Sequence, residues 1–173
     1  MESQPLLRLR PLRMEDEESF LAGHREMTKA DGFAFALGYE PGMTWAGYLR
    51  ALEFNHAGIN LPRGFVPSTL LAAVAGDRIV GRSSIRHRLN AQLLRQGGHI
   101  GYGVLPGYRR HGYATEILRQ SLIVARSLGI DRVLVTCTDS NAASAAVIER
   151  CGGKLDGLVV SEDGLPIRRY WIE

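Results

Sequence analysis

The sequence predicts one α/β domain in which helices cover both faces of a mixed central sheet of about six or seven strands. Segments with strand periodicity alternate with segments of helical periodicity along the whole chain. Some strand segments are joined by tight turns and others by helices, which predicts both antiparallel and parallel neighbours. The chain has 173 residues. This length suits a single domain over residues 1–173 with a sizeable core.

The first half of the chain predicts a strand, two helices and then a hairpin. An acidic run at 15–18 suits the start of the first helix, and Thr44 is a suitable N-cap for the second. Gly76-Asp77 provides the turn of the hairpin. The predicted strands are 6–12, 68–75 and 78–88, the predicted helices are 14–29 and 45–55, and the predicted loops are 30–43 and 57–67.

The second half centres on a strand, a basic turn and a long amphipathic helix. Residues 100–104 alternate as in a strand, and Pro106-Gly107 end it. A short connection over 90–96 precedes this strand. From Gly112 to about Leu128, apolar residues recur at helical spacing. The remaining predicted elements are a buried strand at 133–138, a helix at 141–151, and an antiparallel pair at 155–161 and 167–172.

The composition makes several classes of partner unlikely. The net charge of +3 comes from basic residues that are spread out, so no nucleic-acid partner is expected. No run approaches the roughly 18 apolar residues of a membrane span, and no apolar leader is present, so we expect a cytoplasmic protein without membrane contact. Cys137 and Cys151 are expected as free thiols. Neither they nor the five histidines have metal-ligand spacing, so no metal is expected.

The turn at 109–114 has the properties of an anion site. A helix that begins near Gly112 leaves its first N–H groups without partners, and the helix dipole adds positive potential there. Gly112 lets an anion approach the backbone closely, and Arg109 and Arg110 add charge. The alternative is an ordinary basic corner between a strand and a helix. The strand before it and the helix after it favour a phosphate or pyrophosphate site.

This stretch resembles the signature of the GNAT superfamily of acyl-CoA-dependent N-acyltransferases. That pattern is an apolar strand ending in V-x-P, followed by [QR]-x-x-G-x-[GA] at a helix start. Here it is Val104-Leu105-Pro106 and then Arg109-x-x-Gly112-x-Ala114. The resemblance implies acetyl-CoA as co-substrate, with its pantetheine arm at Val104 and Leu105. It places the pyrophosphate at the turn residues Arg109, Arg110, His111, Gly112, Tyr113, Ala114 and Thr115.

A second stretch is also similar to the family. Asn141 and Ser144 open the helix after strand 133–138, where the family has an Asn that contacts the cofactor. Asn is also simply a good N-cap, so both roles stay open. Many members carry a Tyr seven residues later, proposed to protonate the departing thiolate, but Ile148 stands there. Gly152-Gly153 replaces the usual Gly-Phe. The motifs GHIGY and N-x-x-S-x-x-V-I-E-x-x-G-G point to a subgroup of predicted acetyltransferases without an assigned substrate.

The catalytic residues are less clearly marked. His99 and Tyr102 lie on the central strand, and His99 suits a general base near neutral pH. The alternatives are a buried, hydrogen-bonded histidine and a packing tyrosine. Gly101 and Gly103 predict a β-bulge that would redirect these side chains. Arg86, His87 and Asn90 are candidates for the acceptor pocket, or else a solvated strand end. The loop residues Asp31, Phe33, Phe35, Tyr39, Glu40 and Phe65 are further candidates.

The resemblance implies direct transfer of an acetyl group from the CoA thioester to a primary amine, with a main-chain N–H near Val104 or Leu105 as the oxyanion donor. The acceptor would be a small-molecule, protein or peptide amine. The alternative is a non-catalytic acyl-CoA sensor or protein-interaction module, which the missing Tyr favours. A homodimer is possible, because the apolar end 170–172 suits either an internal strand or a dimer edge.

Overall fold

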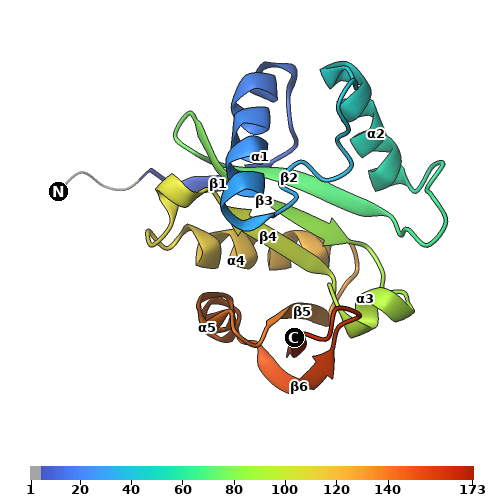
Figure 1. The fold of residues 1–173 in the computed structure, drawn as a ribbon, viewed down its shortest axis with the longest axis vertical. Coiled ribbons are helices and arrows are strands. Elements are labelled where there is room, and N and C mark those ends of the chain that lie inside the picture. The colour runs from blue at the N-terminus through green and yellow to red at the C-terminus, as the bar shows by residue number, and fades with distance from the viewer. Residues whose placement is uncertain (1–4) are drawn as a thin grey trace.

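The computed structural model describes residues 5–173, so residues 1–4 of the predicted domain lie outside the described part. It contains seven strands, five α-helices and two short 3-10 turns in the order shown in Figure 1. The strands are β1 (Leu7–Arg10), β2 (Ser68–Ala75), β3 (Arg78–Arg86), β4 (Ile100–Val104), β5 (Val133–Thr138), β6 (Lys154–Val160) and β7 (Pro166–Ile172). The helices are α1 (Glu17–Asp31), α2 (Trp45–Ala57), α3 (Ala91–Arg95), α4 (Tyr113–Ser127) and α5 (Ala142–Arg150), and the 3-10 turns are η1 (Met14–Asp16) and η2 (Pro106–Tyr108).

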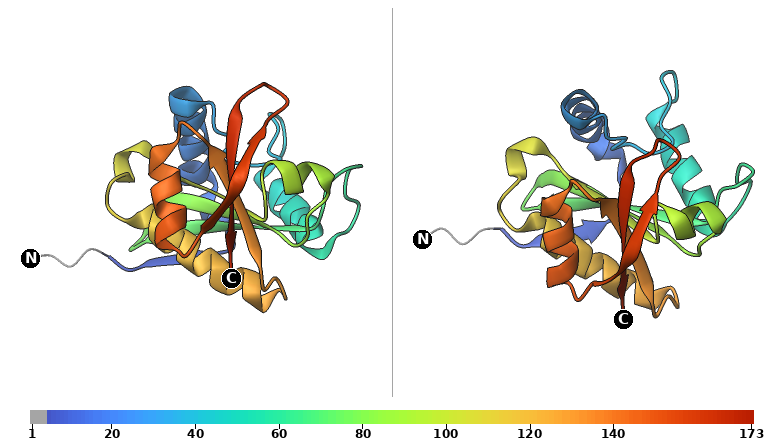
Figure 2. Two further views of the ribbon diagram at one scale, coloured as in Figure 1. Left: turned by 90° about the horizontal axis from the view of Figure 1, so that it is seen from below. Right: turned by 60° about the horizontal axis from the view of Figure 1, so that its bottom comes forward.

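The seven strands form two sheets instead of the single mixed sheet predicted. One sheet has the order β1-β2-β3-β4 and the other the order β5-β7-β6. Every paired neighbour is antiparallel. The α/β class, the number of strands and the cover of helices on both faces are confirmed. The β6–β7 hairpin runs across the direction of the green strands in both views of Figure 2.

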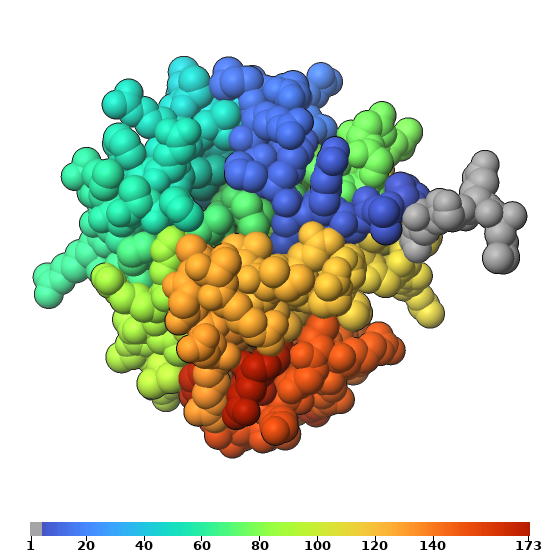
Figure 3. Space-filling model, turned by 180° about the vertical axis from the view of Figure 1, so that it is seen from behind, coloured from blue at the N-terminus to red at the C-terminus, as the bar shows by residue number. Residues whose placement is uncertain are grey.

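Helices cover the four-stranded sheet on both sides. In Figure 1, α1 and α2 lie above it and α4 lies below. The upper core packs aromatic side chains of the N-terminal half, among them Phe20, Phe35 and Trp45, against β2. The lower core packs the apolar stripe of α4, including Ile117, against the opposite faces of the strands. Seen from behind, α4 crosses the surface between the N-terminal half and the C-terminal elements (Figure 3).

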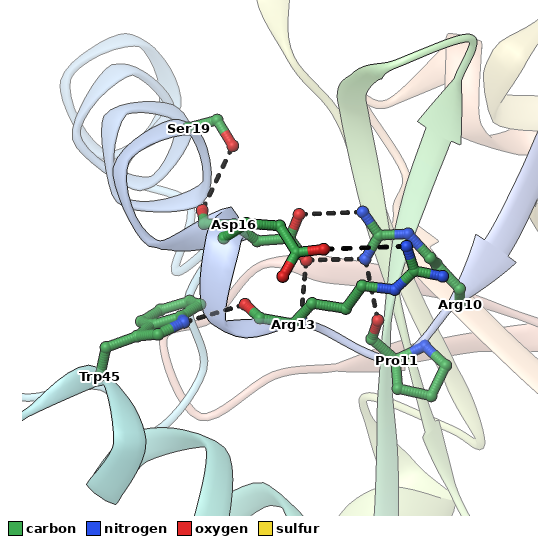
Figure 4. Close-up of polar contacts among 7 residues, drawn as sticks. Arg10, Pro11, Arg13, Asp16, Ser19 and Trp45 are labelled. Carbon is green, nitrogen blue, oxygen red and sulfur yellow. Dashed lines mark hydrogen bonds and ion pairs between the residues drawn. The ribbon is translucent and has the colours of Figure 1, made fainter.

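A hydrogen-bonded cluster at the end of β1 fixes where α1 and α2 begin (Figure 4). Arg10 donates two hydrogen bonds to the Asp16 carboxylate, at 2.7 and 2.9 Å, and the Arg13 backbone N–H donates a third at 2.7 Å. The Trp45 indole N–H donates to the Arg13 carbonyl at 3.0 Å. Burial alone would raise the pKa of Asp16, but these donors outweigh burial and hold the pKa below its usual value.

The two sheets meet at the start of β4. The His99 backbone N–H donates to the Leu134 carbonyl at 2.8 Å, and the His99 ring Nδ1 accepts from the Leu134 N–H at 2.9 Å. Gly98 makes this approach possible, since a Cβ there would lie 2.4 Å from the Leu134 oxygen. Beyond His99 no ladder joins β4 to β5. The two strand edges therefore separate, which is why the structure has two sheets.

Two further expectations are settled by the strand pairing. β3 pairs with β4 in continuous register from Ile85–Ile100 to Gly81–Val104, so the bulge predicted at Gly101 and Gly103 is wrong. β7 lies in the middle of the three-stranded sheet, so residues 170–172 form an internal strand. Within residues 5–173, no helix combines the length and apolar character needed to cross a membrane.

Candidate active site

A hollow of about 240 Å³ opens where β4 and β5 separate. It is lined from both faces of the four-stranded sheet. Phe33, Arg86 and Gly101 border it on the α1 side, and Tyr102, Asn141 and Ser144 border it on the side of α5. Gly97, Ile100, Thr136 and Cys137 complete the lining. The hollow thus connects the two sides of the sheet through the gap between the strands.

The start of α4 is open at Gly112. Gly112 is the N-cap with a left-handed φ of 80°, and no side chain caps this end of the helix. A Cβ at Gly112 would meet nothing within 4 Å, so the backbone can be approached freely. Since α4 has 15 residues, its first N–H groups and dipole present a substantial positive end.

The basic residues of this turn differ in their surroundings. Arg110 is exposed and adopts a left-handed φ of 64°. Arg109 donates from Nε to the Val104 carbonyl at 3.1 Å and forms an ion pair with Asp31. His111 is exposed, with Nδ1 3.2 Å from the Tyr108 carbonyl oxygen. Arg110 and the backbone from Gly112 onward are therefore more available to an anion than the Arg109 guanidinium.

Leu105 and Val104 mark the end of β4. The Leu105 N–H donates to the Val80 carbonyl at 2.8 Å, so it is already engaged as part of the sheet and is a poor candidate for the predicted oxyanion donor. β4 is one of the two edge strands of its sheet. Because backbone groups alternate in direction along a strand, those of Tyr102 and Val104 face the unpaired edge.

Three predicted residues meet in the hollow on the α5 side. The Tyr102 hydroxyl lies 2.9 Å from the Ser144 Oγ. Asn141 caps α5, its Oδ1 accepting from the Ser144 N–H at 3.1 Å, and it also lines the hollow. Burial raises the pKa of Tyr102 to about 12, only partly offset by the hydrogen bond with Ser144. Tyr102 therefore stays protonated at neutral pH and can donate a hydrogen bond or a proton.

Ile148 follows Ser144 by one helical turn, and its side chain is completely buried in the core. It cannot donate a proton. The Tyr102 hydroxyl instead reaches the same face of α5 one turn earlier, because residues 144 and 148 are four apart.

His99 lies at the sheet junction, outside the lining of the hollow. It is 7% exposed. A neutral imidazole has one acceptor nitrogen, and here the Leu134 N–H occupies Nδ1. Burial, with a smaller contribution from the Arg86 charge, lowers the pKa of His99. This geometry favours the buried, hydrogen-bonded alternative over a general base.

The predicted acceptor residues point in different directions. Arg86 lines the hollow. His87 Nε2 is 2.7 Å from the Thr69 Oγ1, which lines a separate hollow of about 370 Å³ between α2 and β2. Asn90 caps α3 by accepting from the Leu93 N–H at 2.9 Å, and its amide donates to the Gly64 carbonyl at 2.8 Å. Neither His87 nor Asn90 lines the hollow at the strand gap.

Of the loop aromatics, Phe33 alone lines this hollow. Phe35 is completely buried in the core and Phe65 is 67% exposed. Tyr39 packs edge-on against Tyr48, with ring centroids 5.4 Å apart. Asp31 is engaged with Arg109.

Sequence reasoning missed Arg82, which lies behind this hollow and is 3% exposed. A signal was present, because three arginines, Arg78, Arg82 and Arg86, recur every four residues in the otherwise small and apolar strand RIVGRSSIR. Charged residues on one face of a buried strand are uncommon unless they are paired or functional.

Within residues 5–173, no cluster of three or more His, Cys, Asp or Glu side chains is arranged to hold a metal ion.

The arrangement agrees with known acetyltransferase folds. RimJ from Mycobacterium smegmatis, solved with CoA-disulfide, has a TM-score of 0.72 and 19% identity, over 97% of this chain and 82% of that one. The putative acetyltransferase yncA from Salmonella typhimurium, solved with acetyl-CoA, has a TM-score of 0.63 and 14% identity, covering 96% and 93%. An N-acetyltransferase from Staphylococcus aureus Mu50 has a TM-score of 0.64 and 15% identity, covering 97% and 98%.

No curated protein sequence matches the chain. The family model described as the acetyltransferase (GNAT) domain matches residues 7–154. That match contains the separated strands, the open helix start and the hollow between them. The chain therefore belongs to the GNAT family of acetyltransferases.

Proposed function

We propose that this acetyltransferase transfers the acetyl group of acetyl-CoA directly to an amine bound in the hollow between β4 and β5. The proposal rests on the succession of three features along one part of the chain: the hollow, the unpaired edge of β4 and the open start of α4. The unpaired edge of β4 borders the hollow at Tyr102, and the chain after β4 leads to an open, uncapped helix start at Gly112. A nucleotide-bearing thioester needs this combination of an anion site and an extended channel.

The residues present fit the co-substrate. Gly112 has open space where a Cβ would be, and no side chain occupies the N–H groups of Tyr113, Ala114 and Thr115 as a cap. These groups, with Arg110, would hold the pyrophosphate. The outward N–H and carbonyl of Tyr102 and the outward N–H of Val104 would bind the amide groups of the pantetheine arm, as an added strand would; the Val104 carbonyl already accepts from Arg109. Asn141 lies where it can contact the arm from α5.

Acetyl-CoA supplies an activated thioester, whose thiolate is a fair leaving group. The protein positions the two substrates, which removes much of the entropic barrier. Tyr102, kept protonated by burial, would donate a proton to the departing thiolate, which Ile148 cannot do, and Ser144 orients its hydroxyl. The attacking amine would lose its proton to solvent water, and water would reprotonate Tyr102, so that the products are the amide and the CoA thiol. The outward N–H of Tyr102 or Val104 is the better candidate for stabilising negative charge on the carbonyl oxygen, because the Leu105 N–H is engaged with β3.

Ligand-dependent thermal unfolding tests the co-substrate. At about 100 times its dissociation constant, a ligand stabilises the folded state by about 2.7 kcal/mol. For a domain of this size, we expect acetyl-CoA and CoA to raise Tm by roughly 5–10 °C. NADH and ATP should produce little shift. Stabilisation by NADH but by neither CoA species would contradict the proposal.

Two glycines at opposite ends of α4 provide a matched pair of variants. Gly112 and Gly129 have φ angles of 80° and 82°, and a Cβ at either would meet nothing within 4 Å. Gly112→Glu and Gly129→Glu should therefore suffer similar backbone strain, of roughly 1–2 kcal/mol. We expect Gly112→Glu to abolish the shift with acetyl-CoA and Gly129→Glu to retain it. Undiminished binding of acetyl-CoA by Gly112→Glu would show that the turn is not part of the cofactor site. In the wild-type protein, release of CoA with an amine acceptor would distinguish a catalyst from a protein that only binds acyl-CoA.

A further inference from the structure

Two arginines of β3, the buried Arg82 and the half-buried Arg86, lie on the α1 side of the hollow. Arg82 and Arg86 are four residues apart on a strand, so both lie on the same face, and we refer to them as the arginine pair. Arg82 donates to three backbone carbonyls: Phe35 at 3.0 Å, Gly101 at 3.1 Å and Ala34 at 2.7 Å. Its guanidinium also lies 4.4 Å from the centre of the Phe33 ring. Arg82 thus holds the loop after α1 against β4.

Arg86 is held less completely. Its Nη1 donates to the Gly97 and Gly98 carbonyls, at 3.1 and 3.3 Å. Within the described residues, these are the hydrogen bonds of this side chain, and Nε and Nη2 take part in none of them. Arg86 also lines the hollow, whereas Arg82 does not. The remaining donors of Arg86 are therefore available to a ligand in the hollow.

In the part of the chain that the structure describes, no acidic side chain forms an ion pair with either arginine of the pair. Within residues 5–173, the ion pairs all involve other arginines. Burial, together with the charge of Arg86, lowers the pKa of Arg82 to about 9, and burial lowers the pKa of Arg86. Buried charges in proteins are normally paired, because an unpaired one is costly. The structural role of Arg82 explains its carbonyl contacts but does not explain a second, unpaired cation beside it.

Gly101 keeps the space in front of the arginine pair clear. A Cβ at Gly101 would meet Arg86 Nη1 at 3.5 Å, Arg86 Nη2 at 3.7 Å and Arg82 Nη1 at 3.9 Å. The three nearest atoms are thus all guanidinium nitrogens, so both cations converge over this glycine. Gly101 lines the hollow on the same strand as Tyr102.

We infer that the acceptor is an amine that also carries an anionic group, a carboxylate or a phosphate, which binds Arg86 with Arg82 behind it. An arginine with free donors suits both groups, because its planar fork can make two parallel hydrogen bonds to either. Spermidine-like polyamines and aminoglycosides are disfavoured, since they would bring further positive charge against the two arginine cations. This inference rests on the proposed function and narrows the class of its acceptor.

Acceptor pairs that differ in one charge test the inference. The probes are the twenty common L-amino acids, their carboxamides, O-phosphoethanolamine, ethanolamine, spermidine and kanamycin. Release of CoA thiol is measured for each. For at least one anionic amine, kcat/KM should be 100-fold or more above that of its uncharged partner. A preference among the amino acids would identify the anion as a carboxylate, and a preference for O-phosphoethanolamine over ethanolamine would identify it as a phosphate. Equal rates for acid and amide, a preference for the polycations, or no reaction with any anionic amine would overturn the inference.

Variants of Arg86 localise the effect. Arg86→Gln should raise KM for the anionic acceptor by about 100-fold while changing that of its carboxamide less than threefold, and Arg86→Lys should recover part of the loss. Arg88→Gln is the matched control. Arg88 follows Arg86 by two residues and is exposed, so this variant removes the same charge from the surface. An Arg86→Gln variant that loses activity equally with acid and amide would show that Arg86 has a structural role only.

Gly101→Ala provides a second variant that retains both arginines. Its methyl group would be in ordinary van der Waals contact with the guanidinium nitrogens, so the fold should persist, but access to them should be reduced. KM for the anionic acceptor should rise at least tenfold, and an unchanged KM would contradict the site.

Calorimetry with acetyl-CoA separates the two proposals. A wild-type protein that does not bind acetyl-CoA refutes the proposed function and the acceptor with it, whereas acetyl-CoA binding with no acid preference refutes the acceptor alone.

Discussion

At the scale of single residues, Tyr102 shows how burial restricts the chemistry open to a side chain. Its hydroxyl is enclosed between β4 and α5 beside Ser144, and its pKa of about 12 excludes the role of a base at neutral pH. The same protonated state makes it a suitable proton donor. Because Ile148 has no dissociable proton and lies in the core, a proton donor at this hollow would have to come from another element, as we propose for Tyr102.

Replacement of Tyr102 tests this role. Tyr102→Phe keeps the ring and removes the hydroxyl, so we expect kcat to fall by about 10- to 100-fold with little change in the affinity for acetyl-CoA. This expected loss of kcat lies at or below the lower end of the rate contributions of general acid–base catalysis, because the thiolate is a fair leaving group. Tyr39→Phe removes the same atom from a ring packed against Tyr48 and should leave kcat unchanged. Wild-type turnover in Tyr102→Phe would exclude Tyr102 as the proton donor.

At the scale of elements, the junction between β4 and β5 decides the shape of the site. His99 makes two hydrogen bonds with Leu134, and the strands separate beyond it. The gap exists because the two edges are held at one end and left unpaired at the other. In this geometry His99, which the sequence suggests as a catalytic base, instead fixes the positions of β4 and β5 relative to each other.

His99→Phe separates the structural from the catalytic role. Phenylalanine keeps an aromatic ring but leaves the buried Leu134 N–H without an acceptor, so the free energy of unfolding should fall by about 1–3 kcal/mol. Urea unfolding measures this loss, and His111→Phe, at an exposed position, is the control. Unchanged stability together with loss of the acidic limb of the pH–rate profile would instead support His99 as the base.

At the scale of the whole molecule, three histidines couple stability to pH. His24, His87 and His99 all have pKa values below 6.5, chiefly because burial disfavours their charged forms. His24 and His99 each accept a hydrogen bond from a backbone N–H, which requires a neutral ring nitrogen. In the unfolded chain, their pKa values return to about 6.5. The unfolded state then binds more protons just below pH 6.5.

Stability should therefore be complete above pH 6.5 and fall as the pH is lowered through the window below it. The urea midpoint at pH 7.5 should exceed that at pH 5.5, and the difference should be smaller in His99→Phe. A midpoint that rises on acidification would contradict the buried, neutral state of these rings.

Most local features of the fold could be predicted from the sequence. The Thr44 cap, which accepts from the Gly47 N–H at 3.0 Å, and the hairpin of β2 and β3 depend on neighbouring residues alone. The start of α4 at Gly112 could be predicted for the same reason. These signals arise from backbone geometry and side-chain periodicity within a few residues. They were enough to indicate the family and a candidate phosphate-binding turn.

By itself, the sequence determined the α/β class, the strands and helices and the basic turn, because local interactions encode them. Only the tertiary structure decided that the strands form two sheets, since pairing depends on residues 35 positions apart such as His99 and Leu134. It also decided that Tyr102 faces Ser144 while Arg82 and Arg86 converge over Gly101 on the opposite face. Whether a charge is paired depends on what folds against it, and no local pattern contains that information.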